Sequence, residues 1–303
     1  MTYRECYGYG IEALTAADIA DAMIDARLLL EFVCHTTRHD LLLHGDRQVD
    51  HEKEIAYKAC IARRSERIPL QHITGEQAFM GFEFLVNEHV LIPRQDTEVL
   101  VEKALGMIRP GMRILDMCTG SGCILLSLLA MSEGCTGVGV DISGEALQVA
   151  RQNKVQVEVQ CGKSLSAEFV ESDLFDRIKS GDLRRGVVAS EPAAENYGCF
   201  DVIVSNPPYI ASAVIDTLEP EVRLHEPMGA LDGTEDGLYF YRKIVAESRA
   251  FLKKGGALLF EIGHDQGAAV AELMKEAGFT GVMVQKDYAG LDRVVYGFYE
   301  EET

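Results

Sequence analysis

The chain has 303 residues, of which 47% are hydrophobic, and this length is more typical of two domains than of one. Its formal net charge of -19 disfavours direct binding of nucleic acid, because proteins that bind polyphosphate usually present a basic face. None of the eight cysteines forms a Cys-x-x-Cys pair, and no apolar run approaches the roughly 20 residues of a membrane helix. We therefore predict a cytoplasmic protein with reduced thiols, no metal site and no membrane span.

Helical periodicity marks the N-terminal part, between Leu14 and Glu66. Apolar residues that recur at helical spacing there are Ala22, Leu29, Leu30, Val33, Ile55, Ala59 and Ala62. We predict a small helical bundle that forms a first domain, residues 1–76. Three arginines of this region, Arg63, Arg64 and Arg67, could contact a partner, but a solvated helix face is the simpler interpretation.

Short extended runs follow between Gln77 and Pro93. The runs at 82–86 and 90–92 flank Asn87 and Glu88, and this pattern predicts a β-hairpin. We assign residues 77–95 to a hairpin linker between two domains.

From residue 96 onward, short apolar segments alternate with helical ones. The predicted strands lie at 112–116, 136–141, 168–170, 200–205, 257–262, 282–285 and about 293–298. This alternation predicts an α/β fold in residues 96–303, with a doubly wound, Rossmann-like sheet that is mostly parallel and has an antiparallel last strand. The polar stretch at 176–199 lacks a period and is interpreted as a surface insertion.

A glycine-rich turn follows the first buried strand of this second domain. It begins at Asp116 and contains Cys118, Thr119, Gly120, Ser121 and Gly122. Glycine lets the backbone approach a ligand closely because it has no Cβ, although a tight turn without a ligand is the alternative. Leu125 stands in place of the third glycine of the dinucleotide fingerprint, which counts against NAD.

The next predicted strand ends at Asp141, and Ser143 follows as a candidate N-cap. A carboxylate at this place accepts hydrogen bonds from both ribose hydroxyls of an adenosyl ligand, and the alternative is a residue that caps a turn. Together, the glycine-rich turn and Asp141 favour a nucleoside cofactor.

The strand at 200–205 runs directly into Asn206-Pro207-Pro208-Tyr209. Proline fixes φ and keeps its predecessor extended, so the Asn206 side-chain oxygen and the Pro207 carbonyl would be two fixed acceptors for a planar amino group. Tyr209 could lie against the plane of that group, and a rigid turn without a substrate is the alternative. If the strands that carry Asp116 and Asn206 are neighbours, cofactor and substrate meet between them.

These motifs resemble those of the release factor glutamine methyltransferase family, also called PrmC or HemK, over nearly the whole chain. The turn after Asp116 resembles the family's Asp-x-Gly-Thr-Gly-Ser-Gly, with Cys118 where glycine is usual, and the Asn-Pro-Pro-Tyr loop matches without change. Residues 93–98 resemble the family's Pro-Arg-Pro-Asp-Thr-Glu segment, with Gln95 in place of the second proline. Leu174 stands where some members place an aromatic residue against adenine, and Phe175 is a candidate substitute.

The resemblance implies a protein-(glutamine-N5) methyltransferase that uses S-adenosylmethionine. Its substrate would be the glutamine of the Gly-Gly-Gln motif in class I peptide chain release factors, which the helical domain would help to hold. The implied cofactor-binding residues are Asp116, Cys118, Thr119, Gly120, Ser121, Gly122, Asp141, Leu174 and Asn206. The implied substrate-binding residues are Asn206, Pro207, Pro208 and Tyr209, of which Asn206, Pro207 and Tyr209 would be catalytic.

Three alternatives stay open at this point. A ribosomal-protein glutamine methyltransferase would share the fold and the loop, and only the helical domain separates it from the first interpretation. An adenine amino-group DNA methyltransferase would share the loop, but the acidic charge disfavours it. The third is a scaffold that binds without turnover.

Overall fold

The computed structural model describes residues 1–179 and 200–300, so most of the predicted polar insertion at 176–199 lies outside the described residues. Contacts within the chain divide it into two compact units. The first unit comprises Met1–Glu76 and Leu218–His225, and the second comprises Gln77–Thr217 and Glu226–Thr303.

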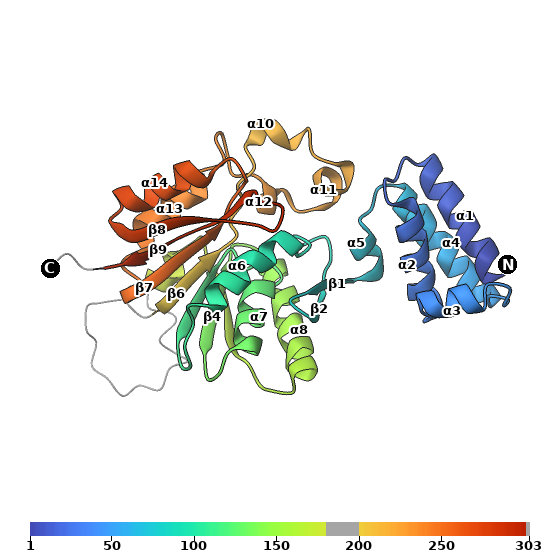
Figure 1. Cartoon of the computed structure of the whole chain (residues 1–303), viewed down its shortest axis with the longest axis horizontal. Coiled ribbons are helices and arrows are strands. Elements are labelled where there is room, and N and C mark those ends of the chain that lie inside the picture. The colour runs from blue at the N-terminus through green and yellow to red at the C-terminus, as the bar shows by residue number, and fades with distance from the viewer. Residues whose placement is uncertain (180–199, 301–303) are drawn as a thin grey trace. The chain divides into compact units, whose positions relative to one another are not determined.

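The first unit is a bundle of helices (Figure 1). Its elements are α1 (Tyr3–Ala16), α2 (Ala22–Cys34), α3 (Arg38–Leu43), α4 (His51–Ser65), α5 (Leu70–Thr74) and α11 (Pro220–His225). Thr2 and Thr37 begin α1 and α3 with capping boxes, in which side chains satisfy free backbone N–H groups. The predicted helical bundle is confirmed, and its core includes Leu14, Leu29 and Ile61.

Helix α4 buries a different face from the one that its apolar residues predicted. The buried residues are Tyr57, Ile61 and Arg64, whereas the predicted Ile55, Ala59 and Ala62 are exposed. The Tyr57 hydroxyl donates to the backbone oxygen of Ala26 at 3.1 Å. Gly10 leaves the space for this hydroxyl, because a Cβ there would lie 2.0 Å from it. The helix therefore turns an aromatic residue and an arginine inward, and shorter alanines outward.

Arg64 is not part of a solvated face, which corrects the interpretation of this arginine cluster. Its Nε lies 2.7 Å from Asp25, and its Nη1 lies 3.0 Å from Glu221 in α11. Arg67 donates to the backbone oxygen of Asp18 at 2.7 Å. Burial raises the pKa of Asp25, and the hydrogen bond from Arg64 opposes that shift. Two of the three arginines thus hold the first unit together.

The β-hairpin of the second unit lies earlier in the chain than the sequence pattern predicted. It pairs β1 (Glu76–Phe79) with β2 (Phe82–Leu85), while the predicted second strand at 90–92 is not a strand. The turn is Met80-Gly81, and both residues have positive φ, of 50° and 80°. A two-residue hairpin turn needs this backbone geometry, which methionine adopts rarely, so the turn carried no sequence signal.

The second unit contains a seven-stranded sheet with the order β5-β4-β3-β6-β7-β9-β8. The strands are β3 (Arg113–Met117), β4 (Thr136–Asp141), β5 (Ser166–Glu171), β6 (Phe200–Ser205), β7 (Leu252–Glu261), β8 (Phe279–Lys286) and β9 (Asp292–Tyr299). Strands β3 to β7 pair in parallel, and β9 runs antiparallel to both β7 and β8. The predicted doubly wound, mostly parallel sheet with an antiparallel last strand is confirmed.

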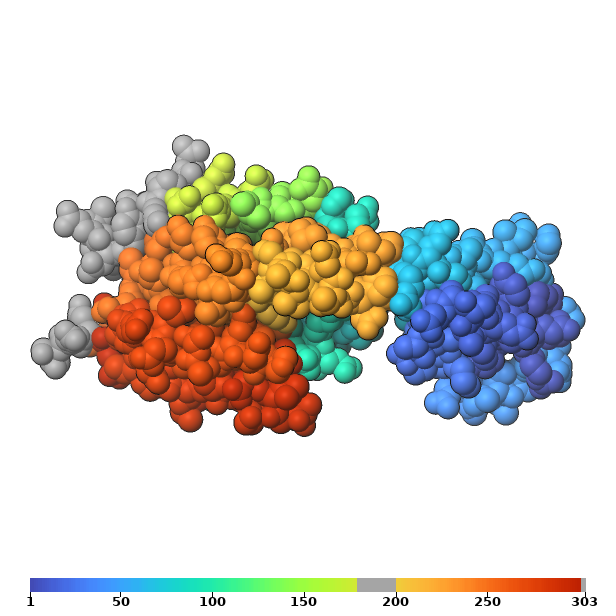
Figure 2. Space-filling view, turned by 90° about the horizontal axis from the view of Figure 1, so that it is seen from above, coloured from blue at the N-terminus to red at the C-terminus, as the bar shows by residue number. Residues whose placement is uncertain are grey.

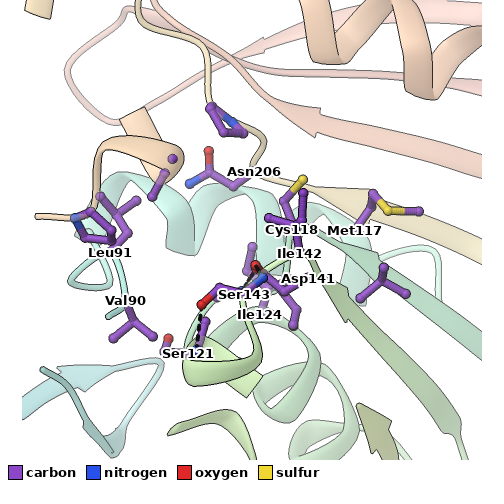
Figure 3. A pocket seen from close by; sticks show the side chains of 18 of the residues that line it. Val90, Leu91, Met117, Cys118, Ser121, Ile124, Asp141, Ile142, Ser143 and Asn206 are labelled. Atoms are coloured by element: carbon purple, nitrogen blue, oxygen red, sulfur yellow. Dashed lines mark hydrogen bonds between the residues drawn. The ribbon is translucent and has the colours of Figure 1, made fainter. Parts of the chain in front are cut away.

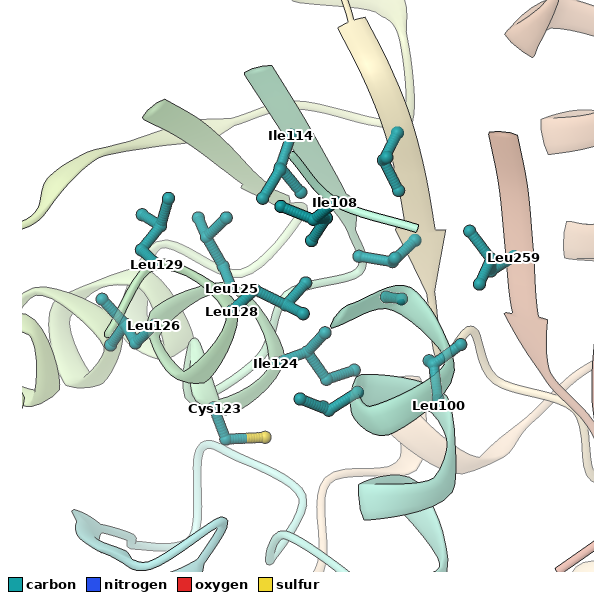
Figure 4. Close-up of a cluster of buried hydrophobic side chains, with 14 of the residues drawn as sticks. Leu100, Ile108, Ile114, Cys123, Ile124, Leu125, Leu126, Leu128, Leu129 and Leu259 are labelled. Carbon is teal, nitrogen blue, oxygen red and sulfur yellow. The ribbon is translucent and has the colours of Figure 1, made fainter. Parts of the chain in front are cut away.

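Helices cover both faces of this sheet (Figure 1). The described helices of the second unit are α6 (Gln95–Leu105), α7 (Cys123–Met131), α8 (Gly144–Cys161), α9 (Asp176–Lys179), α10 (Ser212–Ile215), α12 (Met228–Leu231), α13 (Tyr239–Ser248) and α14 (Gly267–Glu276), of which α10 and α12 lie in the segment after β6. One core cluster packs α6, α7 and α8 on one face, and Figure 4 shows Leu100 and Ile124 within it. The other cluster packs α13 and α14. Neighbouring residues such as Leu258 and Leu259 fall in opposite clusters, because side chains alternate along a strand.

The surface of the residues that follow β6 is visible in Figure 2. Its yellow and orange atoms lie between the green atoms of earlier residues and the red atoms near the C-terminus.

Among the described residues, no helix is both long and apolar enough to cross a membrane.

Candidate active site

The strand order reverses between β3 and β6, since β4 and β5 lie on one side of this pair and β7 on the other. The two strands pair in parallel, with Met117 opposite Ser205. The Ser205 hydroxyl also donates to the backbone oxygen of Met117 at 2.6 Å. The predicted neighbourhood of the Asp116 and Asn206 strands is thus confirmed. Ligands of open α/β sheets bind at the carboxyl ends of strands at such a switch point.

The glycine-rich turn continues β3 with an unusual backbone. Cys118, Gly120 and Gly122 have φ values of 61°, 53° and 78°. Glycine adopts these values without strain, but Cys118 carries a Cβ in a region that L-residues avoid. Asn153 of α8 supports the turn, because its Nδ2 donates to the backbone oxygen of Ser121 at 2.9 Å. The turn is therefore fixed from behind by a buried side chain.

Asp116 lies at the base of this turn and is fully buried. It accepts a hydrogen bond from Oγ1 of Thr119 at 2.6 Å. Burial is the largest cause that raises its pKa, to about 7. Asp116 supports the turn from below and does not line the cavity described next.

A cavity of about 430 Å³ opens at the carboxyl ends of these strands, within the second unit. Figure 3 shows Cys118, Ser121, Asp141 and Asn206 around it. Of the predicted cofactor residues, those on the wall are Cys118, Thr119, Gly120, Ser121, Asp141, Leu174 and Asn206. Gly122 is not on the wall and instead begins α7. A volume of this size suits a cofactor-sized ligand.

Asp141 follows β4 and presents its carboxylate at the wall. Oδ2 accepts from the backbone N–H of Gly120 at 2.8 Å, and Oδ1 accepts from the N–H of Ser143 at 3.0 Å. Burial is the largest cause that raises the pKa of Asp141, and these backbone donors oppose the shift. The two bonds fix the direction of the carboxylate, so that its remaining lone pairs are available to hydroxyl groups.

The Asn-Pro-Pro-Tyr loop is only partly on the wall. Asn206 and Pro208 line the cavity, whereas Pro207 and Tyr209 are not among the lining residues. The Tyr209 backbone oxygen accepts from Nε2 of Gln266 at 3.0 Å, and its ring packs beside the core cluster of α13 and α14. Burial raises the pKa of its hydroxyl. The predicted contacts of Pro207 and Tyr209 with a substrate stay predictions.

The adenine contact predicted near Leu174 needs one correction. Leu174 lines the cavity and has a φ of 44°. Phe175 is fully buried and stacks on Phe251 with ring centroids 4.6 Å apart, so it is not the substitute that the sequence suggested. Phe240 of α13 is an aromatic residue that lines the cavity, and no motif pointed to it.

Comparison with known proteins connects this geometry to a family. A model described as "PrmC N-terminal domain" matches residues 5–75, and one described as "Methyltransferase domain" matches 108–290. The release factor glutamine methyltransferase of Caulobacter vibrioides is 40% identical over 299 residues, which cover 98% of this chain and 96% of that protein. The chain belongs to the release factor glutamine methyltransferase family.

A second relative agrees with this assignment, and a solved structure has a similar fold. The release factor glutamine methyltransferase of Geobacter sulfurreducens is 37% identical and covers 98% of this chain and 96% of its own length. A methyltransferase structure from Pyrococcus furiosus has a TM-score of 0.51 and 18% identity, and covers 79% of this chain and all of that one. At 18% identity, the similarity to the Pyrococcus furiosus structure shows the fold alone.

This family member is a methyltransferase, and its cofactor is S-adenosylmethionine. The residues of the cavity fit that molecule. Asp141 offers a carboxylate to ribose hydroxyls, and Asp173 and Asp232 are further acidic residues of the wall, which suits a ligand that carries a positive charge. Phe240 and Leu174 offer apolar surface to a base.

Sequence reasoning missed part of the wall of this methyltransferase. Thr97 and Arg94 line the cavity from the start of α6, and residues 227–230 line it from α12. Arg94 Nη2 pairs with the buried carboxylate of Glu226, which directly precedes these α12 residues. The Pro-Arg-Gln-Asp-Thr-Glu motif was the available signal for Arg94 and Thr97, but it carried no role for either.

Proposed function

We propose that this enzyme transfers a methyl group to the side-chain amide nitrogen of the glutamine in the Gly-Gly-Gln motif of class I peptide chain release factors. The observation that carries the proposal is the position of Asn206. It lines the cavity directly after β6, at the switch point beside the turn that follows β3. An amide oxygen there is an acceptor for the N–H groups of a planar amide.

The chemical difficulty is the low reactivity of an amide nitrogen, whose lone pair is delocalised into the carbonyl. Bound in the cavity, S-adenosylmethionine supplies the electrophilic methyl group. Oδ1 of Asn206 and the carbonyl of Pro207 would accept the two N–H groups and hold the nitrogen in line for displacement. The same acceptors stabilise the N–H protons as they gain positive character.

Alignment carries more of the rate than proton abstraction does. The nitrogen gains acidity as it is alkylated, so its proton leaves readily to water and no dedicated base is needed. The predicted role of Tyr209, stacking on the plane of the amide, would require its ring to reach the substrate once the release factor is bound. We propose that residues 118–121, Asp141 and Leu174 contact the cofactor, and that Asp116 and Gly122 serve cofactor binding by holding the turn in place.

We assign roles to the domains with the boundaries that the sequence predicts. We propose residues 1–76 as a substrate-binding domain, 77–95 as its linker and 96–303 as the catalytic domain, from which residues 218–225 extend into the first unit. Release factors act on ribosomes, so we propose that the enzyme works in the cytoplasm. A second binding surface suits a substrate whose glutamine lies on a mobile loop, because two weak contacts on one molecule reinforce each other.

The test is a single incubation with labelled S-adenosylmethionine and separate candidate substrates. We expect one methyl group on the Gly-Gly-Gln glutamine of a class I release factor, located by peptide mass spectrometry. A release factor with that glutamine replaced by alanine should take no label. Preferred labelling of a ribosomal protein, or of adenine in DNA, would refute the proposal.

A further inference from the structure

Three polar side chains from separate segments converge at the end of β6. Nδ2 of Asn206 donates to Oγ1 of Thr97 at 3.4 Å. Thr97 lies in the first turn of α6, and Glu261 is the last residue of β7. Thr97 and Glu261 are 3% and 2% exposed, and hydrogen bonding from the side chains of Thr97 and Asn206 opposes the rise that burial causes in the pKa of the Glu261 carboxyl group. We call these three residues the Asn206 cluster.

Sheet register explains why Asn206 and Glu261 meet. Strands β6 and β7 run in parallel with Ser205 opposite Phe260, so Asn206, which directly follows β6, comes beside Glu261, the last residue of β7. The end of β7 is itself held firmly, because the Tyr241 hydroxyl donates to the Glu261 backbone oxygen at 2.9 Å. The cluster is therefore anchored at the ends of two paired strands and in the first turn of α6.

The two ends of the Asn206 amide have opposite chemistry. Nδ2 only donates hydrogen bonds and Oδ1 only accepts them. Nδ2 donates to Thr97. Because Nδ2 and Oδ1 diverge from one carbon, Oδ1 points away from Thr97. Asn206 lines the cavity (Figure 3), and Oδ1 is the end that its partners leave for a ligand.

We propose that Thr97 and Glu261 are positioning residues that fix the Asn206 amide with Oδ1, and not Nδ2, toward the substrate nitrogen. This inference rests on the proposed function, because only an N–H-bearing substrate needs an acceptor there. A flipped amide would place its own N–H groups against those of the substrate, and the transfer geometry would be lost.

An ion pair does not explain why Glu261 is buried. Arg293, whose charge lowers the pKa of Glu261, forms its ion pairs with Asp287 at 3.1 Å and Asp96 at 3.0 Å. Burial outweighs these effects and raises the pKa of Glu261 to about 7. Oε2 is buried, and it has no hydrogen-bond partner within the part of the chain that the structure describes. A buried carboxyl group that has a raised pKa and an oxygen without a hydrogen-bond partner is typical of a functional site.

Thr97→Val tests the inference with the smallest change of shape, since it replaces the hydroxyl by a methyl group. We expect kcat on the release factor to fall roughly 10- to 100-fold, the usual effect of a misaligned reacting group. The KM for release factor and the Kd for S-adenosylmethionine should change less than about 3-fold, because neither depends on which end of Asn206 faces the nitrogen. Thr97→Ser, which restores the hydroxyl, should return kcat to within about 3-fold of wild type.

Glu261 is tested by a second pair of variants. Glu261→Met removes the acceptor and should lower kcat as Thr97→Val does, whereas Glu261→Gln keeps an acceptor oxygen and should retain most of it. Ser127→Ala is the matched control. Its hydroxyl in α7 is buried and has no hydrogen-bond partner among the described residues, and it does not line the cavity. It should leave kcat unchanged.

The outcomes separate this inference from the proposed function. A wild-type enzyme that does not methylate the release factor refutes the proposed function itself. An active wild type with undiminished kcat in Thr97→Val and Glu261→Met refutes only the positioning role. A kcat loss that Thr97→Ser does not restore, or that appears equally in Ser127→Ala, assigns the residues to stability and also overturns the inference. Binding of S-adenosylmethionine, measured by calorimetry on each variant, shows that the protein tested is folded.

Discussion

Gly237 packs directly against the backbone of the Asn-Pro-Pro-Tyr loop, and Gly237→Ala should disturb catalysis from outside the cavity. A Cβ at this position would lie 2.3 Å from the Tyr209 backbone oxygen and 2.7 Å from Nε2 of Gln266. That Nε2 donates to the same Tyr209 oxygen at 3.0 Å, so the added methyl group would be forced into an existing hydrogen bond. Gly237 also has a φ of 71°, which is unfavourable for alanine.

We expect Gly237→Ala to lower the stability of the protein and to displace the Asn-Pro-Pro-Tyr loop. Alanine at this φ costs roughly 1–2 kcal/mol in conformational strain, and loss of the Gln266 hydrogen bond costs roughly 1 kcal/mol more. The steric part moves the loop. Side-chain Cβ atoms essentially never approach another atom within 3.0 Å, so the contact at 2.3 Å must open by roughly 0.7 Å. Because Tyr209 lies three residues beyond Asn206, we expect kcat to fall roughly 10- to 100-fold.

Gly255→Ala is the matched control, because it introduces the same backbone strain at a positive φ without a steric clash. Its φ is 78°, and among the described residues no heavy atom would lie within 4 Å of the new Cβ. Urea denaturation should show a loss of roughly 1–2 kcal/mol for Gly255→Ala and a larger loss for Gly237→Ala. Steady-state methyl transfer should be reduced only in Gly237→Ala. Equal stability and equal kcat in the two variants would refute the steric reasoning.

Three further variants test the site and the first unit. Asn206→Ala should lower kcat roughly 10²- to 10³-fold, as loss of a group that stabilises developing charge does, while calorimetry should show nearly unchanged binding of S-adenosylmethionine. Asp141→Ala should weaken that binding by roughly 1.5–3 kcal/mol, the value of hydrogen bonds to a charged group, and an unchanged Kd would contradict a ribose contact. Arg64→Met leaves the buried carboxylate of Asp25 without its cation, while the half-buried Glu221 keeps only Arg67 at 3.5 Å, so thermal or urea unfolding should show a loss of roughly 3–5 kcal/mol. Wild-type stability in that variant would show that the ion pairs contribute nothing.

Strands of the sheet were predictable because each buried strand is a short apolar run between turns. The strands predicted at 136–141 and 200–205 coincide with β4 and β6. Strand β7 starts earlier than predicted, at Leu252, because its first residues include Lys253 and Lys254, whose polar character hides the strand. The hairpin was predicted too late in the chain because its turn has no typical turn sequence. Met80 occupies a position that favours glycine or asparagine.

The helical unit shows a different limit of sequence reasoning. Apolar periodicity located α4 but selected Ile55 as buried, and this residue is 56% exposed. Arg64 is buried instead, because Asp25 and Glu221 both neutralise its charge. Glu221 lies 157 residues away from Arg64 in the chain. A periodicity of apolar residues contains no information about such a distant partner, so a buried arginine is read as a solvated one.

The site was predictable one strand at a time, but not as an assembly. Sequence placed Cys118 and Asn206 each at the carboxyl end of a strand, and Glu261 could be placed in the same way. Which ends become neighbours depends on the strand order, and β6 pairs with β3 on one side and with β7 on the other. That arrangement puts Asn206 between a turn of the cavity wall and a buried carboxyl group. The loop motif identifies the acceptor, but only the folded arrangement of β6, β7 and α6 brings together the residues that decide which end of its amide meets the substrate.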